Sequence, residues 1–237
     1  MLDILYKESL IGKKEENQDA CLVKTFGNDD MLLAVADGMG GGEMGAELSW
    51  RAIELLDSFF SKGAEYPLQK LKQALFMISD ELFTMLDGRK GGTTLCVVYY
   101  SKKELSFINI GDSRVWVCRN QEIINLTLDQ NSYEYKKLNN IYTEEEDKRF
   151  IHRILGISSS FQIEEMLQSK EWSAFGSFEL QESDTLILSS DGFHDYIQSN
   201  GIQSLCHYNP LNSLPLVFEQ VEENSNDNIT AIIAKEI

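Results

Sequence analysis

The chain has 237 residues, of which 43% are hydrophobic and 25% charged, an ordinary composition for a globular protein with one or two domains. It carries 21 Lys and Arg residues against 38 Asp and Glu residues, a formal charge of −17 at pH 7. Because binding to nucleic acid and to anionic lipid depends on Lys and Arg pairing with phosphates, this balance argues against both kinds of partner. The surplus of acid either aids solubility alone or partly lines a cation site.

The N-terminal segment 1–19 has no uninterrupted apolar stretch, and no later segment could span a bilayer. The four cysteines lie far apart without a CxxC pair: Cys21, Cys96, Cys118 and Cys206. Three of them fall within apolar runs, so we expect buried free thiols rather than disulfides or zinc ligands. These features predict a cytoplasmic protein that stands alone, without a fused sensor or membrane anchor.

The N-terminal half begins with two predicted strands, 20–26 and 31–37, which are joined by a turn. Apolar residues then recur at helical spacing from Glu43 to Phe60 and again from Leu68 to Leu86. Two long helices are therefore expected to follow each other directly.

Strands dominate the next part of the chain, at 93–100, 104–110, 114–119 and 122–128. Their short connections predict an antiparallel meander, because parallel neighbours need crossovers of a dozen or more residues. Residues 129–175 are polar and weakly periodic, and we expect an inserted segment of loop and helix there. A strand at 184–191, a helix around 211–223 and a strand at 228–234 complete a pattern typical of a layered α+β architecture.

The loop "AVADGMGGGEMG" places Gly40, Gly42 and Gly45 at the GxGxxG spacing of a dinucleotide-binding turn. That interpretation requires a helix and then a second parallel strand, which together complete a βαβ unit. Here a second helix follows the first, and Glu65, the acid about 20 residues downstream, falls in the turn between these helices. No Gly-Lys-Ser/Thr follows either, so both nucleotide interpretations are disfavoured.

Five aspartates lie at the edges of loops beside apolar strands: Asp19, Asp37, Asp112, Asp191 and Asp227. Taken alone, Asp37 would fit a helix cap or a turn. Several carboxylates in one cleft, however, cannot all stay ionised without cations, and oxygen ligands select hard ions such as Mg²⁺ or Mn²⁺. Of the three histidines, only His194 lies beside one of these aspartates, so a zinc site is not expected.

Six motifs, in order and at the right spacing, resemble the metal-dependent (PPM-type, type 2C) Ser/Thr protein phosphatases of the bacterial kind: "ENQDA", "VADGMGGG", "GGTTL", "NIGDSRVW", "LSSDGFHD" and "DNIT". The resemblance extends from Gly12 to Thr230. It implies a four-layer α-β-β-α sandwich, with two antiparallel sheets flanked by helix pairs, and a single domain over 1–237 with a flap-like insertion around 129–175. It also implies a signalling hydrolase that acts on phosphorylated proteins and opposes a Ser/Thr kinase.

The resemblance further implies a set of metal ligands for two core ions of Mn²⁺ or Mg²⁺ and a third, weaker one: Asp19, Asp37, Gly38, Asp112, Asp191 and Asp227. In this assignment Asp37 and Asp191 act in catalysis through the metals, Asp19 binds mainly through water, and Asp112 lies beside the third ion. Asn228 supports the ligands from behind or lies on the substrate side. Two such cations lower the pKa of a water that attacks phosphorus directly, so no phosphoenzyme is needed.

The chain departs from the family's pattern at three positions. Lys14 stands where an arginine usually binds the substrate phosphate, and lysine keeps the charge but loses the bidentate fork. Met39 replaces a histidine proposed as a general acid in eukaryotic members, and Gln18 replaces a common glutamate. For His194 we expect a structural or surface role, since proximity alone does not establish acid catalysis.

Other polar residues fit simpler interpretations. Arg114 opens a strand and is expected to be a buried partner for a carboxylate, while Thr93 and Thr94 are expected to be strand and turn residues. The acidic run from Glu144 to Asp147 fits a solvated face, although its segment corresponds to the family's flap near the active site. Two other functions stay open: a catalytically weak regulatory binding module, suggested by Lys14 and opposed by the retained aspartates, and a phosphatase of small metabolites.

Overall fold

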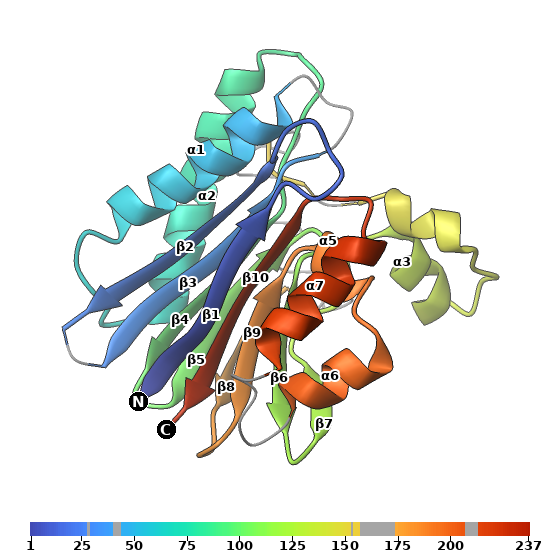
Figure 1. Ribbon diagram of the computed structural model, residues 1–237. Helices are drawn as coiled ribbons and strands as arrows, with labels where there is room; N and C mark the ends of the chain where they lie inside the picture. Colours follow the sequence, from blue (N-terminus) through green and yellow to red (C-terminus); the bar gives the residue numbers. More distant parts are fainter. Residues whose placement is uncertain (28, 40–43, 153, 157–173, 207–212) are drawn as a thin grey trace.

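The computed structural model describes residues 1–27, 29–39, 44–152, 154–156, 174–206 and 213–237 (Figure 1). Two five-stranded antiparallel sheets form its centre. The first sheet contains, in spatial order, β1 (Leu2–Leu10), β10 (Ile229–Glu236), β9 (Thr185–Ser189), β6 (Arg114–Arg119) and β7 (Glu122–Asn125). The second contains β2 (Asp19–Phe26), β3 (Asp30–Asp37), β4 (Leu95–Ser101), β5 (Glu104–Ile110) and β8 (Phe175–Glu179).

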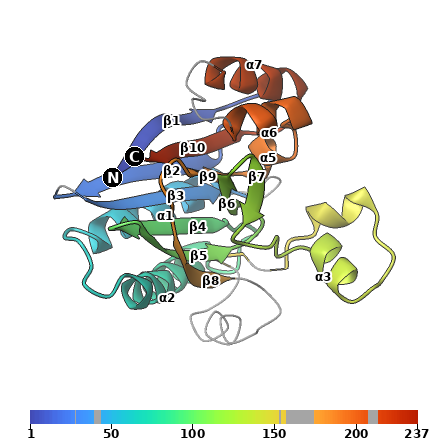
Figure 2. The ribbon, with the colours of Figure 1, turned by 90° about the horizontal axis from the view of Figure 1, so that it is seen from below.

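Helices cover the outer face of each sheet, as Figures 1 and 2 show from two directions. The long helices α1 (Gly45–Phe59) and α2 (Pro67–Leu86) pack on the second sheet. On the first sheet lie α5 (Asp191–His194), α6 (Ser199–Leu205) and α7 (Leu214–Asn224). The predicted four-layer α-β-β-α sandwich is therefore confirmed.

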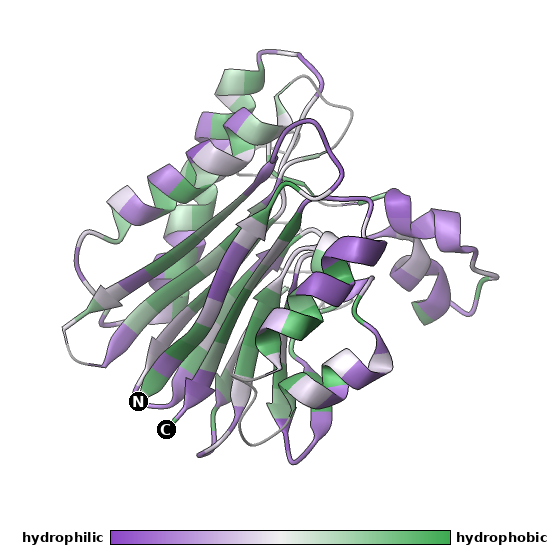
Figure 3. Ribbon diagram, viewed as in Figure 1, coloured by the Kyte–Doolittle hydropathy of each residue, from purple (hydrophilic) through white to green (hydrophobic). Residues whose placement is uncertain are grey.

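Each interface between layers has its own cluster of buried apolar side chains. Successive side chains of a strand point to opposite faces of its sheet, so Leu33 and Val35 of β3 enter the space between the sheets while Leu32 and Ala34 face α1 and α2. Both faces of β3 are buried, which explains why its sequence is apolar without alternation. Figure 3 shows the same division, with apolar strands inside and polar helix faces outside.

The predicted meander over the four central strands is wrong. β4 and β5 pair in the second sheet, whereas β6 and β7 pair in the first. Between β5 and β6 the chain crosses from one sheet to the other through Gly111, whose φ of +107° favours glycine. The crossing is as short as a hairpin turn, so connection length alone predicted the wrong partner. Strands β1 and β8 were not predicted at all.

The described part of the predicted insertion, within 129–175, contains α3 (Ser132–Leu138) and the 3₁₀ helix η1 (Glu145–Arg149). These two elements extend away from the sandwich beside the ends of the strands (Figure 2). Their surface is mainly hydrophilic (Figure 3). Residues 157–173 of the predicted insertion lie outside the described residues.

The expectation of free thiols is wrong for two cysteines. Cys118 in β6 and Cys206 at the end of α6 form a disulfide across 88 residues of sequence, while Cys21 and Cys96 are free. The sequence separation hid this pair, since only the packing of α6 on the first sheet brings the two thiols together. Among the described residues, no helix combines the length and the apolar character that a bilayer crossing requires.

Candidate active site

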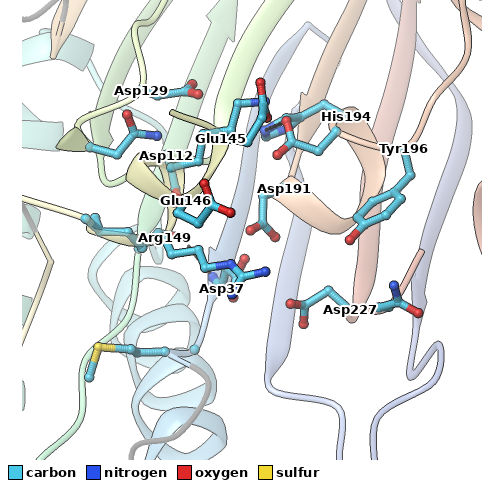
Figure 4. Close-up of a pocket in the computed structure, with 18 of the residues that line it drawn as sticks. Asp37, Asp112, Asp129, Glu145, Glu146, Arg149, Asp191, His194, Tyr196 and Asp227 are labelled. Carbon is cyan, nitrogen blue, oxygen red and sulfur yellow. Dashed lines mark hydrogen bonds and ion pairs between the residues drawn. The ribbon is translucent and has the colours of Figure 1, made fainter. Parts of the chain in front are cut away.

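A cavity of about 630 Å³ opens where the strands of the two sheets end beside η1 (Figure 4). Eight carboxylate side chains line it: Asp37, Asp112, Asp129, Glu145, Glu146, Asp191, Asp195 and Asp227. Three cationic side chains also line it: Lys14, Lys148 and Arg149. Of the predicted site residues, the lining includes Lys14, Asp37, Gly38, Asp112, Asp191 and Asp227, whereas Asp19 and Asn228 lie behind it.

The backbone of Asp37, at the end of β3, is held by the two threonines of "GGTTL". Its amide donates to Thr94 Oγ1 over 2.9 Å, and its carbonyl accepts from the Thr94 amide over 2.8 Å and from Thr93 Oγ1 over 3.0 Å. Thr94 Oγ1 is in turn hydrogen-bonded to Ser113 Oγ over 2.8 Å. These threonines therefore fix the backbone position from which the Asp37 side chain extends. This role was not predicted from their expected positions in a strand and a turn.

Gly38 lies where no larger residue fits. Its amide donates to the Gln18 carbonyl over 3.0 Å, so β2 and the loop after β3 approach closely. A Cβ at this position would collide with the backbone carbonyl oxygens of Gly45 and Gln18. The Asp-Gly pair thus brings a carboxylate and a backbone carbonyl to the same end of the strand. Gly40 and Gly42 of the same loop lie outside the described residues.

The second Asp-Gly pair is built in the same way. Asp191 begins α5 immediately after β9, and a Cβ on Gly192 would collide with the carbonyl oxygen of Asn228. This close approach places Asp191 beside the segment that carries Asp227. Figure 4 shows both carboxylates directed into the cavity, Asp191 above Asp37 and Asp227 to its right.

Asp19 pairs with Asp37 across β2 and β3 and is buried beneath the cavity. Its Oδ2 accepts from Ser190 Oγ over 2.8 Å, but among the described residues its Oδ1 has no hydrogen-bond partner. Burial raises the pKa of Asp19 to about 6, in spite of the hydrogen bond from Ser190. A buried carboxylate oxygen without a donor is costly, and a cation or an ordered water would satisfy it.

The neighbouring carboxyls have raised pKa values for related reasons. Burial, followed by the charges of Asp19, Asp191 and other carboxylates, raises the pKa of Asp37 well above its ordinary range. Burial and the charge of Asp227 raise the pKa of Asp191 to about 7. The pKa of Asp112 is also well above its usual range, through burial and the charges of Asp191 and Asp129. These carboxyls can all be ionised together only if positive charge compensates them.

The donors present fit a hard divalent cation. All are carboxylate or backbone oxygens, as Mg²⁺ and Mn²⁺ prefer, and the orphaned Asp19 oxygen and the raised pKa values both indicate missing positive charge. The side chains are not arranged as a finished ligand set, because within the described residues no three His, Cys, Asp or Glu side chains converge in a geometry that could hold an ion. The residue assignment of the ligands therefore stays a prediction.

Lys14 and Asp227 form an ion pair, with 2.8 Å between Nζ and Oδ1. Partial burial opposes the charged form of Lys14, but this bond and the charges of Asp227, Asp191 and Asp37 raise its pKa overall. Asn228 holds the loop that carries Lys14, because its Nδ2 donates to the carbonyls of Ile11 and Glu16 over 2.8 and 2.9 Å. The Asn228 side chain therefore positions Lys14 from behind.

Arg114 pairs with a carboxylate, as predicted, through two bonds of 2.7 and 2.6 Å to Asp129, although its side chain is half-buried rather than buried. His194 lines the cavity, with its Nδ1 3.0 Å from Ser189 Oγ. Burial, together with the charges of Arg114 and Lys148, lowers the pKa of His194 well below its ordinary value. The imidazole is thus neutral near pH 7 and is held by a structural contact, in line with the role expected for it.

The contribution of η1 to the cavity was not predicted from the sequence. Glu145, Glu146, Lys148 and Arg149 all line it, although their run of charges fits a solvated face equally well. The one available signal was that this segment corresponds to the flap of the resembled family. Charge and spacing gave no indication of which of these side chains turn inward.

Comparisons with known proteins identify the family of the chain. The family model described as Protein phosphatase 2C matches residues 8–233. The chain is 23% identical over 210 residues to the Serine/threonine phosphatase stp of Listeria monocytogenes, covering 81% of this chain and 78% of that protein. It is 26% identical over 244 residues to the Serine/threonine protein phosphatase PstP of Mycobacterium tuberculosis, covering 95% of this chain and 45% of that protein.

Solved structures share the fold. The Serine/threonine phosphatase Stp1 of Staphylococcus aureus superimposes with a TM-score of 0.84 at 23% identity, covering 100% of this chain and 96% of that one. The catalytic domain of PstP in complex with two manganese ions superimposes with a TM-score of 0.80 at 23% identity, covering 99% of each chain.

Proposed function

Because the chain belongs to the protein phosphatase 2C family and is a Mg²⁺- or Mn²⁺-dependent serine/threonine protein phosphatase, we propose that it hydrolyses phosphoserine and phosphothreonine by direct attack of an activated water. Two divalent cations, when bound, supply a water nucleophile near neutral pH and offset charge on the phosphoryl oxygens. We further propose that residues 1–237 act as one catalytic domain on phosphorylated proteins and oppose a Ser/Thr kinase.

The observation that carries this proposal is the gathering of the Asp37, Asp191 and Asp227 carboxylates in one cavity with Lys14. Asp37, Asp191, Asp227 and the Gly38 carbonyl would hold the cations, with Asp19 beneath them and Asp112 at the edge. Thr93 and Thr94 fix the backbone of Asp37, so its carboxylate need not be ordered when substrate arrives. Lys14 attracts the phosphate as a single positive charge.

Two side chains at the site do not act as charged acids toward the leaving oxygen. Met39 lines the cavity and has no exchangeable proton, and burial keeps His194 neutral. The leaving oxygen must gain a proton when its bond to phosphorus breaks. In our proposal, solvent that reaches the open cavity supplies this proton. Activity should accordingly survive replacement of His194 by glutamine.

The test is Mn²⁺-dependent hydrolysis of a phosphothreonine peptide. Asp37→Asn and Asp191→Asn should each lower kcat by about 100-fold or more, the scale of losing a group that stabilises transition-state charge. Asp3→Asn, an exposed aspartate of β1, serves as the matched control and should leave kcat unchanged. Full activity of either cavity variant would refute the assignment of these residues.

The same assay separates the competing functions. A panel of phosphorylated metabolites, run beside the peptide, would reveal a small-molecule phosphatase by its higher kcat/KM. A regulatory binding module would bind the phosphopeptide without turning it over. Faster hydrolysis of the peptide than of every metabolite supports the protein phosphatase.

A further inference from the structure

A substrate phosphate must enter a cavity that is lined mainly by carboxylates. Bound cations offset part of this charge, but the phosphoryl oxygens that point away from the cations still need donors from the protein. The cationic side chains of the lining are Lys14, Lys148 and Arg149. They differ in how much of their charge is already paired.

Two of the three already have partners. Lys14 Nζ lies 2.8 Å from Asp227 Oδ1. Lys148 Nζ lies 3.0 Å from Glu145 Oε2 and 5.5 Å from the centre of the Tyr133 ring. An incoming phosphate would have to compete with these contacts.

Arg149 has no such partner. Its side chain is exposed, and neither an ion pair nor a hydrogen bond connects it to any of the described residues. It is the last residue of η1, and Figure 4 shows its side chain directed into the cavity, toward the floor formed by Asp37. A guanidinium without a polar partner among the described residues therefore lines the same cavity as the carboxylates that would hold the cations.

The backbone beneath Arg149 is well anchored. Reciprocal hydrogen bonds between Glu144 and Asp147 begin η1, and Lys136 Nζ is 2.6 Å from Asp147 Oδ1. The carbonyl of Phe150, the next residue, accepts from the amide of Ser132 over 2.9 Å. η1 is thus tied to α3, while the Arg149 side chain is left free to bind a ligand.

We propose that Arg149 binds the phosphoryl group of the substrate through its guanidinium. The planar fork of arginine donates two parallel hydrogen bonds to phosphate oxygens, which Lys14 cannot do. With cations on the carboxylates, the guanidinium faces positive charge, and a phosphate dianion between them satisfies both sides. Arg149 would then supply, from η1, the bidentate contact that is missing at position 14. This inference rests on the proposed function.

The test compares Arg149→Gln and Arg149→Lys with the Mn²⁺-saturated wild type, with Lys137→Gln as a charge-matched control. Lys137 is exposed on α3, pairs with Glu134 and does not line the cavity. Binding of inorganic phosphate is measured by calorimetry, and KM and kcat are measured for p-nitrophenyl phosphate and a phosphothreonine peptide. Melting temperatures of the variants should match the wild type, because the Arg149 side chain has no hydrogen bond or ion pair with the described residues to lose.

We expect Arg149→Gln to weaken phosphate binding about tenfold, which corresponds to about 1.4 kcal/mol. KM should rise by a similar factor for both substrates while kcat changes less, and Arg149→Lys should recover part of the loss. Lys137→Gln should leave all values unchanged.

Two results would overturn the proposal: unchanged phosphate binding in Arg149→Gln, or a raised KM for the peptide alone, which would place the guanidinium on a neighbouring acidic side chain of the peptide. Failure of the proposed function is distinguishable. In that case phosphate binding would still depend on Arg149, but the wild type would hydrolyse neither substrate.

Discussion

At Asp37 and Gly38, backbone groups do most of the positioning. Three hydrogen bonds with Thr93 and Thr94 hold the Asp37 backbone, and the Gly38 amide donates to the Gln18 carbonyl. The carboxylate is therefore placed by the sheet and by a close approach of the backbone that only glycine allows. Substitution at Gly38 should therefore lower the stability of the fold in addition to any effect on catalysis.

Gly38→Ala is predicted to lower the free energy of unfolding by ~1–3 kcal/mol, because the new methyl group meets the carbonyl oxygens of Gly45 and Gln18. Urea unfolding of the metal-free protein measures this. Gly27→Ala is the control, since Gly27 has a φ of +61° but nothing within 4 Å of the added Cβ. A loss at Gly38 no larger than that at Gly27 would contradict the collision.

At position 14, Lys14→Arg is predicted to lower KM for a phosphopeptide about three- to tenfold. The guanidinium can keep one bond to Asp227 and offer a second donor to phosphate, whereas the lysine ammonium is a single charge. Lys13→Arg, at the exposed neighbour that donates to the Glu223 carbonyl over 2.8 Å, serves as the control. A raised or unchanged KM in Lys14→Arg would rule out this role.

Residue roles could be predicted where a chemical cost is visible in the sequence. An arginine beside an aspartate-rich turn needs a carboxylate, and Arg114 has one in Asp129. The charged residues of η1 need no protein partner, since water can solvate them. Which of them faces the cavity depends on the packing of η1 against α3, so Arg149 could not be found from its neighbours in sequence.

Among the elements, long segments with one strong period were predicted well. The bounds of α1, α2 and β3 lie within two residues of the predicted ones. These elements are buried on one or both faces, and the spacing of their apolar residues shows this burial directly. β1 was missed because its sequence includes charges and all of its residues except Leu2 are partly or fully exposed. The assignment of β6 and β7 to the other sheet depends on one turn at Gly111, which no periodicity reveals.

The Cys118–Cys206 disulfide links β6 to α6. It should stabilise the folded protein by about 2–4 kcal/mol, since it closes a loop of 88 residues in the unfolded chain. Cys118→Ser should lower the melting temperature under oxidising conditions and leave it equal to that of the reduced wild type.

A thiol count gives an independent check of the disulfide. Wild type that is denatured without reductant should show two reactive thiols, Cys21 and Cys96, and four after reduction. Four thiols in protein purified under oxidising conditions would contradict the bond. In a reducing compartment the bond would be open, so its presence in cells is a property of the environment as well as of the fold.

For the whole molecule, the clustered carboxyls couple stability to pH. The folded-state pKa of Asp191 is about 7 and that of Asp19 about 6, both above the unfolded value of 3.8. The stability that such groups contribute is present at low pH and is lost as pH rises through the folded pKa. The metal-free protein should therefore melt at a lower temperature at pH 8 than at pH 6.5.

In this pH window the contribution from His194 opposes that of the carboxyls only in part. Its folded pKa is depressed, so its contribution to stability is present above pH ~6.5 and is lost only at more acidic pH. Differential scanning calorimetry in a metal chelator measures the shift. A difference of ~1 kcal/mol corresponds to about 2–4 °C for a chain of this size.

Mn²⁺ should raise the melting temperature more at pH 8 than at pH 6.5, since cations compensate carboxylates only when these are ionised. Asp191→Asn should flatten both the pH profile and the response to Mn²⁺, and Asp3→Asn should change neither. Equal stabilisation by Mn²⁺ at both pH values would contradict the link between the raised pKa values and cation binding.

The pairing of β1 with β10 also has a consequence for biosynthesis. These strands come from opposite ends of the sequence, and the Met1 amino group lies 2.8 Å from Glu236 Oε1. The pairing of β1 with β10 also brings Lys14 to Asp227. A nascent chain in which β10 has not yet been synthesised therefore has neither a complete first sheet nor a complete cavity. Translation itself thus delays the onset of activity, and a ribosome stalled before β10 would carry an inactive polypeptide.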